Sequence, residues 1–444
     1  MNSSPNKPGN GLLLLPLSSI IYQDASQNLF IIDIPVSISL AQHLPNITKN
    51  DSHFRIPLIY SSDAIASPYS GPSPEPKTDQ AKAKVLKLVP AEEREYHTLI
   101  CGLVEDEIRR LGRNFRGEWC YARQTLPPCE EAGFPLPSKK YLGINGLDLV
   151  FALPTGQTMA PEKNQGQSHR DLVSTSPPVI LSSELNVFSS PREISNALVK
   201  NPSSHQTRIK LSGALDSTIA SEEPDLGREI FFRIPPKSTF ILTHFQPSLP
   251  CLTNPLSLVP PNQYFDFILA DPPWPNRSAK RSKQYTISTL SFDDLELLIG
   301  NISRKFLISS GIVAVWVTNS QKARRAVENA FQAAGVRKIE EWVWVKTTVI
   351  GQVVTALNGV WRKPYEILII GRAGGQEYDI RRRITAGVPD IHSRKPAIRE
   401  LVEQAFFDNK EYTALEVFAR SLTAGWWAVG DEVIKFNWDG WWAD

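Results

Sequence analysis

The sequence has few cysteines, and they follow no pattern typical of a metal site or a disulfide framework. The four are Cys101, Cys120, Cys129 and Cys251, and no two of them form a C-x-x-C pair. No histidine is spaced to complete a zinc site. We therefore expect no metal, and we interpret the cysteines as small buried side chains in a reducing compartment.

Long apolar runs are also absent. No stretch approaches the roughly 20 apolar residues that a membrane helix needs. The short run Leu12–Leu15 is stopped by Pro16 and is followed by no small-residue cleavage pattern, which argues against a secretory signal. The sequence thus predicts a soluble, intracellular protein that does not act at a membrane.

Neither sign of charge dominates the chain. The net charge is +2 over 444 residues, so any surface that binds nucleic acid has to be local. Proline (35) outnumbers glycine (25), which indicates extended or irregular segments between compact parts. The length is enough for two or three domains.

The composition changes near residue 229. Residues 1–228 are uneven, with a candidate strand at Phe30–Ile34, a charged helical segment at Pro90–Gly112 and Ser/Pro-rich stretches that cannot bury a core. Residues 229–444 alternate apolar strands with amphipathic helices, which predicts an α/β fold with a mostly parallel sheet covered on both faces. We therefore expect a mixed, partly disordered N-terminal region at 1–228 and a catalytic domain at 229–444.

The strands and helices expected in the second part are specific. Strands are expected at Phe265–Ala270, Gly311–Val317, Ile339–Lys346, Glu366–Gly371 and Leu415–Arg420, with a closing strand pair over Trp426–Phe436. Helices are expected at Phe292–Phe306, Ser320–Ala334 and Pro396–Phe407. In open sheets of this kind, ligands bind beyond the carboxyl ends of the strands.

The tetrapeptide Asp271-Pro272-Pro273-Trp274 stands at such a strand end. An aromatic amine is a poor nucleophile because its lone pair is delocalised into the ring. The Asp271 carboxylate and the Pro272 carbonyl could accept its two hydrogens, and the prolines would fix the backbone that presents them. Trp274 would offer a flat face to a base. Such catalysis needs positioning and charge stabilisation but no covalent intermediate. A purely structural interpretation, in which Trp274 packs in the core, also stays open.

Several motifs in order carry a resemblance to a known family. They are Asp271–Trp274 with Asn276, Ser278, Lys280–Ser282 and Tyr285; Val315–Asn319; Trp342–Lys346; Lys363–Glu366; His392–Pro396; Leu415–Arg420; Gly425-Trp426; and Gly430–Val433. Over residues 230–438 the chain resembles the adenine-N6 methyltransferases typified by the enzyme that writes N6-methyladenosine in messenger RNA. Within that family it is most similar to the methyltransferase-like-four branch.

The resemblance implies a Rossmann-like, circularly permuted fold that binds S-adenosylmethionine near its C-terminus. Leu415–Arg420 would be the cofactor strand. The residues implied for the cofactor are Ala270 and Asp271 at the methionine end, Lys395 and Arg420 at the carboxylate or ribose, Asp431 and Glu432 at the ribose hydroxyls or adenine, and His392 as a further contact. Asp431 stands where the family more often has Asn, and Arg394 where it more often has a second His.

Basic and aromatic residues next to the motif suggest a nucleic-acid contact. Asn276, Lys280, Arg281, Lys283 and Tyr285 follow the catalytic turn closely enough to bind phosphates and bases of a substrate strand. The further basic clusters Arg324-Arg325 and Arg381–Arg383 fit phosphate binding and a solvated face equally well. The tryptophans at 438, 441 and 442 could stack on bases, but packing over a sheet edge is the favoured interpretation.

These observations predict methylation of the N6 amino group of adenine in nucleic acid. The base must be flipped out or unpaired, which favours RNA, and the resemblance implies a small nuclear RNA adenosine or 2′-O-methyladenosine. DNA adenine is the alternative substrate, and methylation of cytosine N4 or a glutamine amide fits the motif less well. A non-catalytic RNA-binding scaffold of the same fold is the alternative of another class. We expect a nuclear monomer, with the cytoplasm as a second location and a protein partner left open. Residues 1–228 could position RNA or contact a partner.

Overall fold

The computed structural model describes most of the chain. The described residues are 18–45, 56–70, 75–76, 78–125, 177–212, 230–245, 254–275, 290–374, 379–391, 394–408 and 411–443. Within these ranges, no helix is both long enough and apolar enough to cross a membrane.

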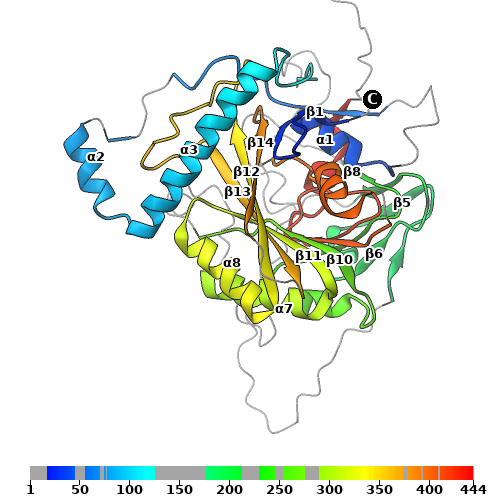
Figure 1. Cartoon of the computed structure of the whole chain (residues 1–444). Helices are drawn as coiled ribbons and strands as arrows, with labels where there is room; N and C mark the ends of the chain where they lie inside the picture. Colours follow the sequence, from blue (N-terminus) through cyan, green and yellow to red (C-terminus); the bar gives the residue numbers. More distant parts are fainter. Residues whose placement is uncertain are drawn as a thin grey trace, which may run out of the picture.

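A 12-stranded sheet forms the centre of the molecule (Figure 1), in the order β1-β2-β14-β12-β13-β11-β10-β15-β16-β9-β6-β4. Its strands are β1 Ile20–Gln23, β2 Leu29–Ile32, β4 Val179–Ile180, β6 Leu198–Lys200, β9 Thr239–Leu242, β10 Phe265–Ala270, β11 Leu307–Val317, β12 Val336–Lys346, β13 Tyr365–Ala373, β14 Arg381–Gly387, β15 Ala414–Val417 and β16 Trp427–Gly430. Most neighbouring strands are parallel, which confirms the predicted mostly parallel sheet.

The carboxyl ends of the parallel strands meet at one edge of the sheet. The adjacent strands β11, β10, β15, β16 and β9 all run in the same direction. Strand β13 is antiparallel to both β11 and β12, so it begins at the edge where β12 ends. Residues that follow Ala270, Val317, Lys346, Val417 and Gly430 are therefore brought together with residues that precede β13.

Helices cover both faces of this sheet. The helices α3 Ala91–Asn114, α7 Phe292–Phe306 and α8 Gln321–Ala333 pack on one face. The helix α1 Ile34–Ala41 and the helix α9 Arg399–Val402, which continues as a π-helical turn over Glu403–Phe407, pack on the other. Alternate residues of β10 serve the two cores, with Ile268 on the first face and Phe267 on the second. This alternation explains why the strand is apolar over Phe267–Ala270 without interruption.

Local signals fix the ends of the helices on the first face. Ser291 and Asp294 form a reciprocal capping box at the start of α7. Helix α8 is followed by Gly335, whose φ of +69° favours glycine.

Smaller elements complete the structure. The strands β5 Leu185–Phe188, β7 Thr207–Leu211 and β8 Ile230–Ile234 form a three-stranded sheet, and β3 Leu58–Ile59 pairs with β17 Trp442–Ala443. The remaining elements are α2 Asp79–Leu86 and the 3₁₀ turns at Pro191–Glu193, Asn254–Leu258, Lys435–Asn437 and Asp439–Trp441. Trp441 and Trp442 are buried, as the packing interpretation predicted.

Two predicted basic clusters are structural. Arg324 donates to Glu93 of α3 at 2.6 Å and is buried. Arg382 and Arg383 pair with Glu341 and Glu340 of the neighbouring strand β12. The interpretation of these clusters as phosphate-binding surfaces is therefore wrong for these three arginines, because each guanidinium group is already paired with a carboxylate within the protein.

Two strand predictions near the C-terminus are also corrected. The predicted strand Leu415–Arg420 ends at Val417, because Phe418 takes a φ of +61° and turns the chain. The closing strand pair over Trp426–Phe436 is wrong: β16 ends at Gly430 and leads into a turn and a 3₁₀ segment.

The sheet takes strands from both sides of the predicted division at residues 228 and 229. Strands β1 and β2 extend it at one edge, and β4 and β6 extend it at the other. The domain boundary stays a prediction. The Ser/Pro-rich stretches expected to bury no core lie partly within the described residues, at 61–70, 75–76, 177–178 and 200–212. That expectation is wrong for Thr207–Leu211, which forms β7 and buries Ile209 and Leu211 in a core cluster. The rest of these stretches lies outside the described residues.

Candidate active site

Asp271 lies at the carboxyl edge of the sheet, directly after β10. Its backbone N–H donates to the Val417 carbonyl at 3.2 Å, which joins the end of β10 to the end of β15. Its Oδ1 accepts from Lys395 Nζ at 2.6 Å, and its Oδ2 lies 3.8 Å from a terminal nitrogen of Arg420. The structure therefore brings three predicted site residues into one cluster.

A chain of alternating charges extends this cluster to β12 and β13. Lys395 Nζ also lies 3.4 Å from Glu366 Oε2, and Lys346 Nζ donates to Glu366 Oε1 at 2.6 Å. Glu366 belongs to β13 and Lys346 ends β12, so the antiparallel pairing of these strands places the two side chains together. These contacts form a row of alternating charges along the sheet edge, in the spatial order Lys346, Glu366, Lys395 and Asp271, which we call the charge row.

Coulombic attraction outweighs desolvation in this row. Burial tends to raise the pKa of Glu366, but the cations of Lys395 and Lys346 outweigh it and hold that pKa at about 2. Burial likewise tends to lower the pKa of Lys395, but the carboxylates of Asp271 and Glu366 outweigh it and raise that pKa. Both side chains are therefore charged at neutral pH.

A second ion-pair cluster lies at the ends of β15 and β16. Arg420 Nε donates to Glu432 Oε2 at 2.9 Å, and Lys435 binds the other oxygen of Glu432. Asp431 Oδ2 lies 3.3 Å from His244 Nδ1, and this contact raises the pKa of His244. Asp431 and Glu432 follow β16, the neighbour of β15. Acids at such a strand end can accept hydrogen bonds from ribose hydroxyls. The roles predicted for Asp431 and Glu432 stay predictions.

The turn over Asp271–Trp274 is anchored by its tryptophan. Trp274 N–H donates to the Pro272 carbonyl at 2.8 Å, so one lone pair of that predicted acceptor is used within the turn. The Trp274 indole N–H donates to the Trp316 carbonyl at 2.7 Å, and its ring stacks on Phe292 at a centroid distance of 5.9 Å.

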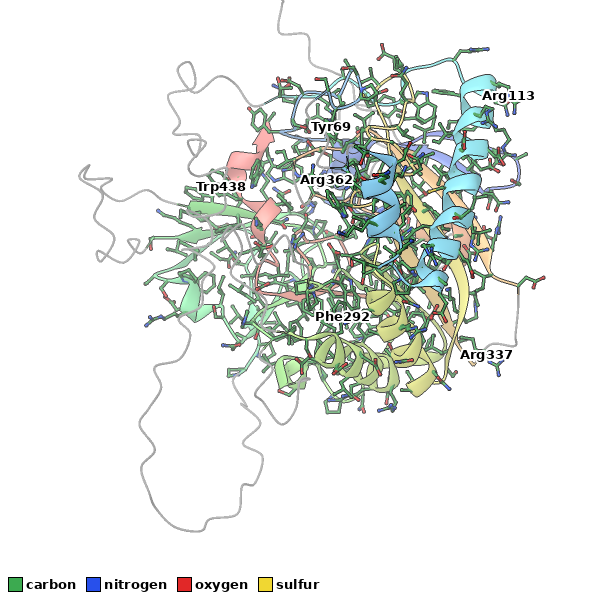
Figure 2. The ribbon with its side chains drawn as sticks, turned by 90° about the vertical axis from the view of Figure 1, so that its left-hand side faces the viewer. Tyr69, Arg113, Phe292, Arg337, Arg362 and Trp438 are labelled. Carbon is green, nitrogen blue, oxygen red and sulfur yellow. The ribbon has the colours of Figure 1, made fainter. Side chains whose placement is uncertain are left out.

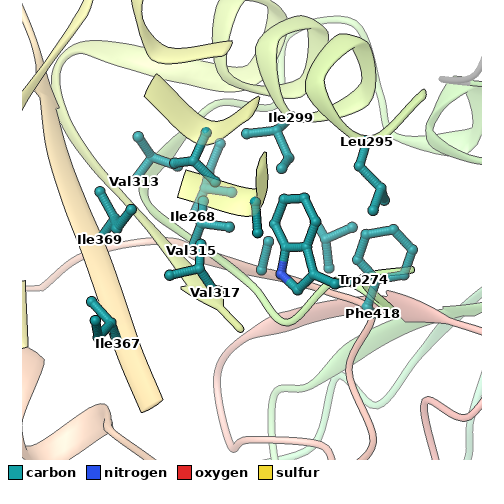
Figure 3. Close-up of a cluster of buried hydrophobic side chains, with 14 of the residues drawn as sticks. Ile268, Trp274, Leu295, Ile299, Val313, Val315, Val317, Ile367, Ile369 and Phe418 are labelled. Atoms are coloured by element: carbon teal, nitrogen blue, oxygen red, sulfur yellow. The ribbon is translucent and has the colours of Figure 1, made fainter. Parts of the chain in front are cut away.

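This packing corrects the role predicted for Trp274. Its side chain lies in the apolar cluster with Leu295 and Ile299 (Figure 3), and only 6% of the residue is exposed. No ring face is left for a base, because Phe292 and the core cover it. Trp274 instead holds Asp271, Pro272 and Pro273 in place.

A cavity beside Asp271 contains an acid that the sequence did not single out. Its lining includes Asp271, Lys395, Arg420 and Glu416, together with Ile38 of α1. Burial, and secondarily the Asp271 carboxylate, raise the pKa of Glu416 to about 8. Among the described residues the Glu416 side chain has no hydrogen-bond partner, and its carboxyl is protonated at neutral pH. It could therefore donate to a bound molecule as well as accept from one.

Some predicted residues lie outside the described part of the chain. They are the five predicted substrate contacts, Asn276, Lys280, Arg281, Lys283 and Tyr285, and the predicted cofactor contact His392. Ala270 is buried at the end of β10, and its proposed closure of the methionine end stays a prediction. Arg394, at a position where the family more often has a histidine, is a buried ion-pair partner of Asp390.

Three residues of the site were missed: Lys346, Glu366 and Glu416. All three stand inside motifs that carried the resemblance, but no role followed from their local sequence. The signal that could have found them is their position at strand ends. A correct order of β12, β13, β11, β10 and β15 brings them to Asp271.

The residues present fit S-adenosylmethionine. The cavity offers carboxylates and cations next to apolar walls, as a cofactor with a charged amino-acid end and an adenosine requires. Gly430 allows the close approach of β16 to the turn after β15, since an added Cβ would lie 3.1 Å from the Ala419 carbonyl oxygen. Among the described residues, no group of three or more His, Cys, Asp and Glu side chains could hold a metal ion.

Comparison with known proteins agrees with this geometry. Residues 265–432 match the family model described as MT-A70. The chain is 38% identical over 186 residues to the N6-methyladenosine RNA methyltransferase MTA1 of Cryphonectria parasitica, covering 40% of this chain and 55% of that protein. It is 33% identical over 221 residues to the human N(6)-adenine-specific methyltransferase METTL4, covering 46% of this chain and 44% of that protein.

A relative named for DNA is matched as well. The chain is 28% identical over 206 residues to the DNA N6-methyl methyltransferase of Caenorhabditis elegans, covering 45% of this chain and 53% of that protein. The chain thus spans about half the length of the curated relatives that it matches. The predicted resemblance, including the METTL4-like branch, is confirmed. Residues 265–432 of this chain are an MT-A70 domain.

Proposed function

We propose that this chain transfers a methyl group from S-adenosylmethionine to the N6 amino group of adenine in nucleic acid. The observation that carries the proposal is the position of Asp271. Its carboxylate stands at the end of β10, beside a cavity and between the cations of Lys395 and Arg420. The names of the matched relatives, which are adenine-N6 methyltransferases, support the same reaction.

The residues of the chain would act by positioning. Bound S-adenosylmethionine would supply an electrophilic methyl group. The Asp271 carboxylate would accept a hydrogen bond from the adenine amine, and the remaining lone pair of the Pro272 carbonyl could accept the other. The ion pairs to Lys395 and Arg420 fix the carboxylate before the substrate arrives, so little reorganisation is needed in the transition state.

We propose RNA as the substrate, and within RNA an adenosine of a small nuclear RNA or a 2′-O-methyladenosine. Single-stranded or looped RNA presents an unpaired base, which in-line methyl transfer needs. Two matched relatives are named for RNA or for adenine in general, and one is named for DNA, so DNA adenine is the alternative substrate. A nuclear location and a monomeric state belong to the same proposal. A scaffold without activity is the alternative of another class, but it would not need the ion pairs of Asp271 with Lys395 and Arg420.

The test is a transfer assay with labelled S-adenosylmethionine and matched adenosine-containing RNA and DNA oligonucleotides. The Asp271→Asn variant should lose at least about 100-fold in rate, because a neutral amide cannot replace the charge at the reacting amine. The control is Asp266→Asn at the opposite end of the same strand, which should stay within about twofold as most substitutions away from a site do.

Nucleoside mass spectrometry of the products then separates the outcomes. N6-methyladenosine in the RNA arm alone supports the RNA proposal, and its appearance in the DNA arm alone replaces RNA by DNA. Equal activity of Asp271→Asn and wild type would overturn the role of Asp271. A calorimetric titration in which the wild-type protein does not bind S-adenosylmethionine would favour the alternative of a non-catalytic RNA-binding scaffold.

A further inference from the structure

The loop between β12 and β13 connects two residues of the active site. It leaves the sheet after Lys346 and returns at Tyr365 and Glu366, and both Lys346 and Glu366 belong to the charge row that ends at Asp271. Residues 347–364 therefore stand at the edge of the sheet where the substrate must enter.

This loop exposes a tryptophan. Trp361 is 55% exposed, and it is the only exposed residue among the eleven tryptophans, all of which fall in the described part of the chain. The other ten are buried or half-buried. The Trp361 indole, on the loop that links two residues of the charge row, is therefore accessible to a ligand.

The backbone around Trp361 is hydrogen-bonded to an acid from a segment distant in sequence. Glu75 accepts from the backbone N–H groups of Val360 at 2.5 Å, Trp361 at 2.9 Å and Arg362 at 3.1 Å. Burial tends to raise the pKa of Glu75, but these three donors and the Lys363 cation outweigh it and lower that pKa. Gly359 makes the tight turn, since an added Cβ would lie 2.5 Å from the Arg362 carbonyl oxygen. These hydrogen bonds and the Gly359 turn anchor the backbone that carries Trp361.

The surface around the tryptophan is basic. Arg362 is exposed next to it, and Lys363 follows. Helix α2 begins a few residues after Glu75, buries none of its residues, and carries Lys82 and Lys84, with Lys87 at its C-cap. Figures 1 and 2 show α2 beside this loop, with Arg362 labelled in Figure 2. An aromatic face among cations is the arrangement that binds single-stranded nucleic acid.

We propose that Trp361 stacks on an unpaired base flanking the target adenine, and that Arg362 and the α2 lysines contact the phosphates of the same strand. This inference rests on the proposed function and names the part of the substrate held outside the catalytic cavity. The span from Trp361 to Glu366 is at most about 18 Å even when fully extended, which places the stacked base within a few nucleotides of the target.

Stacking on an indole distinguishes poorly between bases, because every base has a π face. The Trp361 surface would therefore contribute affinity for unpaired strands and little sequence preference. A duplex, whose bases are already stacked on one another, would gain nothing from it. RNA and single-stranded DNA share this chemistry, so both are arms of the test.

The test measures binding of a labelled 12-nucleotide strand with one central adenosine, as RNA and as DNA, in the presence of S-adenosylmethionine. Trp361→Ala should weaken binding about tenfold, and Trp361→Phe should recover most of the loss because a phenyl ring still stacks. The matched control is Tyr264→Ala, which removes an exposed aromatic residue at the opposite edge of the sheet, before β10, and should leave binding unchanged.

A second strand, with abasic sites flanking the adenosine, isolates the stacking contact. Wild type and Trp361→Ala should bind this strand equally, since no base is left to stack. Two results would overturn the inference. One is equal binding of the intact strand by wild type and Trp361→Ala. The other is a Trp361→Ala variant that binds the abasic strand as much more weakly than wild type as it binds the intact strand. Weaker binding by Trp361→Ala without any methyl transfer by the wild-type protein would instead count against the proposed function alone.

The basic part of the surface has its own readout. Replacing Lys82, Lys84 and Lys87 by Ala should reduce the slope of log Kd against log salt by about 0.7 for each phosphate that is no longer neutralised. Calorimetric binding of S-adenosylmethionine should not change. An unchanged salt slope would remove α2 from the proposed surface.

Discussion

Lys395 is the residue on which the charge row of the active site depends. Its ammonium group has three N–H donors, of which one binds Asp271 at 2.6 Å and a second faces Glu366 at 3.4 Å. Within the described part of the chain, the third donor has no hydrogen-bond partner and is available to a bound molecule. Lys395 can therefore hold Asp271 in position and still make the cofactor contact that the sequence predicts for it.

Glu416 differs from the other acids of the site because, among the described residues, no cation forms an ion pair with it. Its folded-state pKa of about 8 lies above the ordinary glutamate value, so the folded protein keeps a proton that the unfolded chain releases. The associated stabilisation is complete below the unfolded pKa and is lost as the pH rises toward 8. Stability should therefore fall between about pH 5 and pH 8 on account of this residue.

The variant Glu416→Gln tests this at the residue scale. Glutamine resembles the protonated acid and does not titrate, so the variant should lose less thermal stability than wild type between pH 6 and pH 9. Unfolding temperatures measured across this range check the result, with Glu411→Gln at an exposed position as the control. Parallel curves for wild type and Glu416→Gln would contradict the raised pKa.

At the scale of single elements, local sequence signals predicted those whose ends have their own chemistry. Helix α7 spans the residues that its apolar spacing predicts, and β10 matches its apolar run. The strand predicted at Leu415–Arg420 is too long at its carboxyl end, because nothing in the local pattern shows that Phe418 adopts a positive φ.

The candidate site shows the same limit. The motifs predict Asp271, Lys395 and Arg420 as site residues. Lys346 and Glu366 reach the site only because β12 pairs with β13 in antiparallel orientation. Strand order depends on contacts distant in sequence, and local periodicity contains no information on it. The base-stacking role predicted for Trp274 is wrong for a related reason. Its burial depends on Phe292 and Trp316, which contact it only in the folded protein.

Strand β13 offers a test of packing between an element and its neighbours. An added Cβ at Gly371 would lie 2.5 Å from Val336 Cγ1 and 2.7 Å from Phe331 Cε2, both of which are buried. Gly371→Ala should therefore lower the free energy of unfolding by about 1–3 kcal/mol. Denaturant titration measures the change.

The control for this variant has the opposite expected sign. An added Cβ at Gly112 of α3 would meet nothing within 4 Å. Gly112→Ala should stabilise the protein by up to about 1 kcal/mol, because alanine favours a helix interior more than glycine does. A Gly371→Ala variant as stable as wild type would show that α8 and β12 yield to the extra methyl group.

At the scale of the whole molecule, the N-terminal half contributes to the same sheet and the same cavity as the MT-A70 domain. Strand β2 pairs with β14 through Leu29, Phe30 and Ile31. Ile38 of α1 lines the cavity with Asp271. Helix α3 buries Ile100 and Val104 against the face that also holds α7 and α8. The site is therefore built from both halves of the chain.

This shared construction predicts that residues 229–444 do not fold when expressed alone. Removing β2 would leave the β14 edge unpaired, and removing α1 and α3 would expose apolar side chains of both cores, including Trp344 and Ile384. An unpaired edge next to exposed apolar surface promotes association between chains. Light scattering should show aggregates of the fragment, and co-expression with residues 1–228 should restore a soluble complex that binds S-adenosylmethionine. A monodisperse fragment 229–444 that binds the cofactor on its own would show instead that the boundary predicted from the sequence separates two independent folding units.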